Sequence, residues 1–74
     1  MLIASPVRAE QETTAATRQY GAAAKLQNIQ SFDLAAGAWA EFVKKFPKDE
    51  RAAEAYYHLG VCNYQVDRLE PALA

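Results

Sequence analysis

Apolar positions at helical spacing mark the middle of the chain. They recur three or four residues apart, at Phe32, Ala35, Trp39, Phe42 and Phe46. Residues with this spacing share one side of an α-helix, and the polar residues between them face solvent. Pro47 cannot continue such a helix, because proline lacks the amide hydrogen that the helix needs. The pattern predicts an amphipathic helix over residues 32–46 that buries its aromatic side.

A second helix is predicted before this one and a third after it. Helix-forming residues fill positions 8–30, and Gly21 among them is expected to let another helix approach closely. Ser31 or Asp33 would cap the middle helix, and Asp49 would cap a third helix over residues 50–66. This third helix is apolar over more than half of its circumference, so it should contact neighbours on two sides.

The chain is then expected to turn once more. Asp67 and Arg68 should end the third helix, and residues 69–74 should begin a fourth. Pro71 would lie in the first turn of that fourth helix, where proline is tolerated. The predicted fold is therefore all-α, with three helices and a truncated fourth.

Composition and charge remove several classes of function. The 74 residues carry a net charge of −1 and no block of like charge, so the chain lacks the basic patch that nucleic-acid binding requires. No apolar run approaches the roughly 18 residues that a membrane span needs. The single cysteine, Cys62, cannot form an internal disulfide. One small helical domain without a membrane span is the class that remains.

The first nine residues, MLIASPVRA, can be read in two ways. Val7-Arg8-Ala9 fits a small-x-small signal-cleavage pattern, although the apolar part is short and no basic segment precedes it. The same residues also suit the start of a helix, with Ser5-Pro6 in its first turn. Residues 1–16 are therefore assigned either to a signal remnant or to the frayed beginning of the first helix.

Glu54, His58 and Cys62 are the best candidates for chemistry. They lie four residues apart on the third predicted helix, and each side chain can bind a metal. A zinc site needs three or four ligands, and the sequence has no second His or Cys to complete one. We therefore expect an exposed Glu and His beside a small buried thiol, with no metal, no cofactor and no catalytic residue.

The chain also resembles itself at a shift of 37 residues. The shift aligns Tyr20 with Tyr57, Ala22 with Leu59, Ala23 with Gly60, Phe32 with Leu69, and Ala35 with Ala72. A period of this size is typical of helical solenoids, in which each helix pair buries its apolar side against the next.

The segment AEAYYHLGVCNYQVDRLEPALA, residues 53–74, resembles the first helix and turn of a tetratricopeptide repeat. The resemblance covers residues 17–74 as about one and a half repeats, with bounds of 17–50 and 51–74. The chain departs from the family at Asp67, where a turn glycine is usual, at Asn63, and at Pro71. The structural repeat positions are Ala35, Trp39, Phe42, Pro47, Tyr56, Leu59, Gly60 and Ala72.

This resemblance implies a right-handed α–α superhelix that acts as a non-catalytic scaffold for protein–protein interaction. Its ligand would be a protein or peptide, held by the first helix of each repeat. Tyr57 and Tyr64 would equally suit packing against a further repeat of the same chain. The ligand-facing residues would be Thr17, Tyr20, Ala24, Gln27 and Asn28 in one repeat, and Glu54, Tyr57, Val61, Tyr64 and Gln65 in the other.

The long linker FPKDERAAEAYYHLG is similar to that of bacterial envelope members of the family, such as the cell-division coordinator of the Tol-Pal system and the outer-membrane assembly lipoproteins. That similarity implies a piece of a larger, exported protein of the periplasm or cell envelope, while a cytoplasmic location stays open. Two alternatives remain. One is a capping or self-association segment, because a repeat array needs about three units for stability. The other is a metal-binding helical protein.

Overall fold

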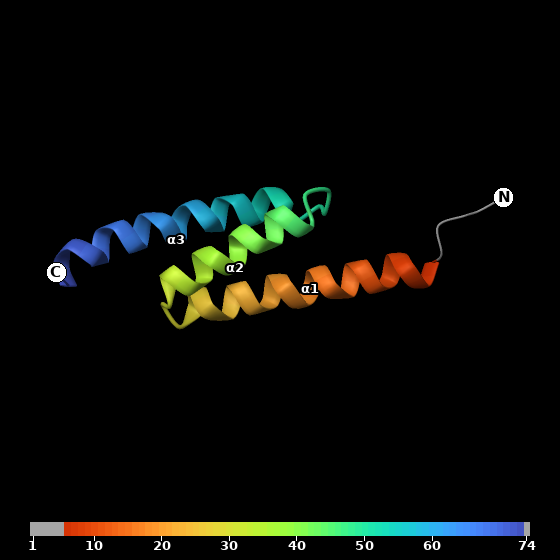
Figure 1. Cartoon of the computed structure of the whole chain (residues 1–74), viewed down its shortest axis with the longest axis horizontal. Coiled ribbons are helices and arrows are strands. Elements are labelled where there is room, and N and C mark those ends of the chain that lie inside the picture. Colours follow the sequence, from red (N-terminus) through yellow and green to blue (C-terminus); the bar gives the residue numbers. More distant parts are fainter. Residues whose placement is uncertain (1–5, 74) are drawn as a thin grey trace.

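The computed structural model describes the backbone of residues 6–73 and the side chains of residues 12–68. It contains three helices, α1 (Pro6–Asn28), α2 (Phe32–Lys45) and α3 (Ala52–Leu73), and no strand within the described residues (Figure 1). The all-α prediction is confirmed. Of residues 1–16, which were assigned to a signal remnant or to the frayed start of the first helix, residues 1–5 lie outside the described part of the chain and residues 6–16 belong to α1.

α2 is the central element of the fold. It packs against α1 on one side and α3 on the other, and each helix reverses the direction of the one before it (Figure 1). α2 is also the shortest, with 14 residues against 23 in α1 and 22 in α3. The amino-terminal part of α1 and the carboxyl-terminal part of α3 therefore extend past α2 in opposite directions, which gives an elongated molecule of 59 × 17 × 15 Å.

The turn between α1 and α2 is closed by the backbone alone. The amide of Ser31 donates to the carbonyl of Leu26 at 2.9 Å, and that of Gln30 to the carbonyl of Gln27 at 3.0 Å. Gln30 has a φ of 65°, the left-handed conformation that this helix ending needs. Ser31 stands at the start of α2, but its side chain forms no capping hydrogen bond. Ser31 therefore occupies the predicted N-cap position of α2, but its side chain does not form the predicted capping hydrogen bond.

The turn between α2 and α3 follows the sequence closely. α2 ends at Lys45, two residues before Pro47, as predicted. Asp49 accepts a hydrogen bond from the backbone amide of Arg51 at 2.8 Å, and its carbonyl accepts one from Ala52 at 2.9 Å. Asp49 thus stabilises the turn and does not cap the predicted start of the helix. α3 begins at Ala52, two residues later than predicted.

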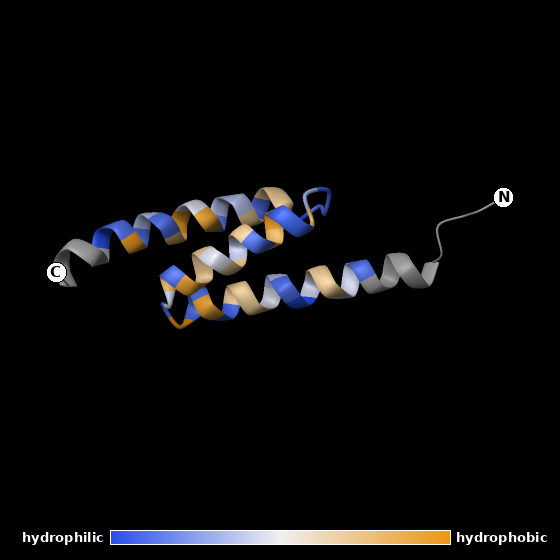
Figure 2. Cartoon of the chain, in the orientation of Figure 1, coloured by the Kyte–Doolittle hydropathy of each residue, from blue (hydrophilic) through white to orange (hydrophobic). Residues whose placement is uncertain are grey.

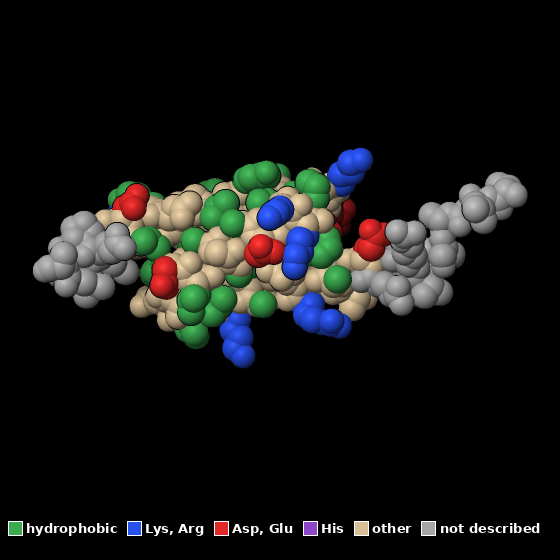
Figure 3. All heavy atoms as spheres, in the orientation of Figure 1, with side chains coloured by type: hydrophobic (Ala, Val, Ile, Leu, Met, Phe, Trp, Pro, Cys, Tyr) green, Lys and Arg blue, Asp and Glu red, His purple; other side chains and the backbone are tan. Residues whose placement is uncertain are grey.

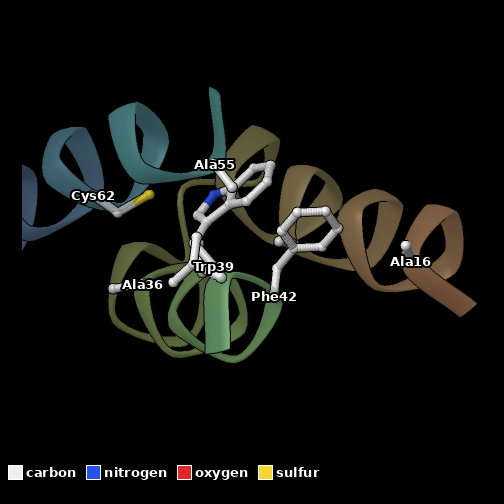
Figure 4. Packing of buried hydrophobic residues seen from close by; sticks show 9 residues of the cluster. Ala16, Ala36, Trp39, Phe42, Ala55 and Cys62 are labelled. Atoms are coloured by element: carbon white, nitrogen blue, oxygen red, sulfur yellow. The ribbon is translucent and has the colours of Figure 1, made fainter. Parts of the chain in front are cut away.

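Two aromatic side chains from α2 form the centre of the core. Trp39 and Phe42 are both 0 % exposed, and small residues of the other helices surround them (Figure 4). Burying one such side chain stabilises the fold by about 2–3 kcal/mol. The small residues of this cluster are Ala16 and Ala23 on α1, Ala35 and Ala36 on α2, and Ala55 and Cys62 on α3.

The structure corrects three local predictions. α3 continues as one helix to Leu73, so Asp67 and Arg68 do not break it and no fourth helix begins within the described residues. Neither side chain prevents a helix, because Asp and Arg are both tolerated in a helix interior. A Cβ added at Gly21 would have no neighbour within 4 Å, so the expected close approach of another helix at this glycine is wrong for the described residues.

Candidate functional site

A shallow apolar hollow lies on the outside of α3. It is lined by five residues that we call the tyrosine face: Tyr56, Tyr57, Gly60, Val61 and Tyr64. Tyr57 is 68 % exposed and Tyr64 is 60 % exposed, which is unusual for large aromatic residues in a regular helix. Hydrophobic side chains are seen along this side of the molecule in Figure 3.

α3 is apolar on two opposite sides. Its inner side carries Ala55 and Cys62, both 0 % exposed, against Trp39 of α2. Its outer side carries the tyrosine face. Hydrophobic positions accordingly recur along α3 between hydrophilic ones (Figure 2). This arrangement agrees with the sequence prediction that the helix contacts neighbours on two sides. Within the described residues, other helices cover only its inner side.

Arg68 borders the tyrosine face at its carboxyl-terminal end. Its guanidinium carbon lies 5.7 Å from the centre of the Tyr64 ring, a distance at which a cation is attracted to the face of an aromatic ring. Glu54 lies three residues before Tyr57, towards the other end. The face is therefore apolar in the middle, with an acidic residue towards one end and a basic residue at the other.

Tyr20 of α1 was predicted to belong to the same ligand-facing surface, but it lies between the helices. Its ring meets those of Trp39 and Phe42 edge-on, at centroid distances of 4.7 and 5.5 Å. Its hydroxyl donates a hydrogen bond to Oε1 of Glu54 at 2.9 Å. Burial, and next this hydrogen bond, raise the pKa of Tyr20. Tyr20 therefore joins α1 to the core and to α3.

Gln27, another predicted ligand-facing residue, also has an internal contact. Its Oε1 accepts a hydrogen bond from the indole Nε1 of Trp39 at 2.8 Å. A buried indole N–H needs such a partner, because leaving it unpaired costs about 1–3 kcal/mol. Ala24 packs against the core, whereas Asn28 is exposed at the end of α1.

Arg51 joins the start of α3 to α1. Its Nη1 donates to the hydroxyl of Thr17 at 2.9 Å, and its guanidinium lies 5.7 Å from the centre of the Tyr20 ring. Its Nε and Nη2 donate to the two carboxylate oxygens of Asp49, at 2.9 and 3.0 Å. These hydrogen bonds lower the pKa of Asp49. Thr17, the first of the predicted ligand-facing residues, is thus engaged between the helices.

Glu54, His58 and Cys62 do not converge on a common point. Glu54 bonds to Tyr20, the His58 ring stacks on Trp39 at 4.7 Å, and the Cys62 thiol is buried. Burial raises the pKa of Cys62, which opposes the thiolate form that a metal requires. Within the described residues no group of three potential ligands lies close enough to hold a metal ion.

The residues predicted to face a ligand therefore fall into two groups. Tyr57, Val61 and Tyr64 lie together on the outside of α3, with Gln65 partly buried beside them, whereas Tyr20 and Gln27 stabilise the helix packing. Tyr56 was assigned to a structural repeat position but is 59 % exposed and lines the hollow. Residue spacing alone did not identify it, because Tyr56 lies four residues after Ala52 and three before Leu59, on the side of the helix that was predicted to be buried.

Comparisons with known proteins do not assign a family. No family model, no curated protein and no solved structure matches this chain. In the described part of the chain, no helix is both long enough and apolar enough to span a membrane.

Proposed function

We propose that this chain is a non-catalytic protein-binding module whose tyrosine face contacts a protein partner. The exposed tyrosines on the outside of α3 are the observation that carries the proposal. A contiguous apolar patch on a small domain is typical of an interaction site. Tyrosine suits such a site, because its rigid ring buries a large apolar area and its hydroxyl still finds a polar partner.

The other polar groups support a structural rather than a catalytic reading. Tyr20 pairs with Glu54, Arg51 pairs with Asp49 and Thr17, and Gln27 pairs with Trp39. These contacts hold α1, α2 and α3 together, which favours a structural role for these side chains. The tyrosine face is an apolar surface that no other described helix covers.

We further propose that the fold is a tetratricopeptide-like array within a larger, exported protein. Three successive helices that pack each on the one before, with Ala35 and Trp39 buried between them, support this reading.

Site-specific photocrosslinking tests the binding function. The photoreactive residue p-benzoylphenylalanine is placed at Tyr57 or, as a control, at Ala40, which is exposed on α2. In cells that express the chain, we expect a protein adduct from position 57 and none from position 40. The protein in the adduct is then purified, and its affinity for the chain is measured by calorimetry.

The affinity measurement decides the outcome. Tyr57→Ser combined with Tyr64→Ser should raise the dissociation constant at least about tenfold, because aromatic anchors dominate binding energy. Ala40→Ser should leave it unchanged. The absence of an adduct at position 57, equal adducts at both positions, or an unchanged affinity of the double serine variant would each contradict the proposal.

A further inference from the structure

We draw no further inference here: the strongest candidate, the tyrosine face on the outer side of α3, belongs to the site already described, and nothing in the structure shows what covers it.

Discussion

The inner and outer sides of α3 use opposite residue sizes. The inner side consists of small residues such as Ala55 and Cys62, because α2 supplies Trp39 and Phe42 to fill the space between the helices. The outer side carries three tyrosines around Gly60, and no described helix provides a surface for them. Both sides are apolar, yet only the inner side is part of the core.

This contrast shows why hydrophobicity alone cannot separate a core from a binding surface. A core contact pairs large residues on one helix with small residues on its neighbour, as Trp39 does with Ala55. Large residues that recur on the side opposite such a contact have no role in that core. In this chain they identify the tyrosine face, and the size of the residues is a better guide than their polarity.

Removing the largest core side chain should have the greatest effect on stability. Trp39→Ala leaves a cavity between the three helices and should lower the free energy of unfolding by about 3–5 kcal/mol. Tyr57→Ser, on the outer side, should change it by at most about 0.5 kcal/mol. Urea unfolding of dilute protein, followed by circular dichroism, measures both. If Trp39→Ala leaves no folded protein, Trp39→Phe provides a milder test. Equal losses from the two sides would contradict the assignment of a single core side to α3.

Enlarging residues on the two sides should produce effects of opposite sign. Ala55→Leu should destabilise the chain by about 1–3 kcal/mol, because Ala55 is 0 % exposed and additional atoms would overpack the core. Gly60→Ala should stabilise the monomer by about 0.5–1 kcal/mol, since alanine is the better helix former and the added methyl group meets nothing. Thermal unfolding of dilute samples gives both values. A stabilising Ala55→Leu would show that the inner side is not closely packed.

Local periodicity was sufficient to predict the helices and the core of α2. The spacing of Trp39 and Phe42 predicted the buried side of this helix, and Pro47 predicted its end. Asp67 and Arg68 were wrongly taken as a break, because a helix boundary there would need a turn residue or a neighbouring element that residues 6–73 do not provide. The tertiary context, rather than propensity, decides the length of α3.

The candidate site was predicted less completely, for a physical reason. Tyr20 and Tyr57 hold equivalent places in the 37-residue repeat, and their sequence surroundings look alike. Tyr20 has α2 and α3 on either side, which take up its ring and hydroxyl, whereas Tyr57 has a helix on one side of α3 only. Which tyrosine remains exposed depends on the number of neighbouring helices, and residue spacing within one helix does not contain that information.

The smallest predicted effect concerns the residues that fix which side of α3 faces inward. Asp49 and Arg51 close the turn before α3, and Arg51 reaches Thr17 and Tyr20 on α1. The pKa of Asp49 is lowered on folding, so the stability that this carboxylate contributes is present above about pH 4, its unfolded value, and is lost as the pH falls through the folded pKa. Thermal melts between neutral pH and about pH 2 should therefore show an acid loss of stability that Asp49→Asn reduces. The same variant should lose about 0.2–1 kcal/mol at neutral pH, the size expected for an ion pair near the surface. Arg51→Met should reduce the same acid loss, and the double variant should add little to either single change, because both substitutions remove one interaction. Additive effects of the two substitutions would instead mean that Arg51 orients α3 through α1 alone.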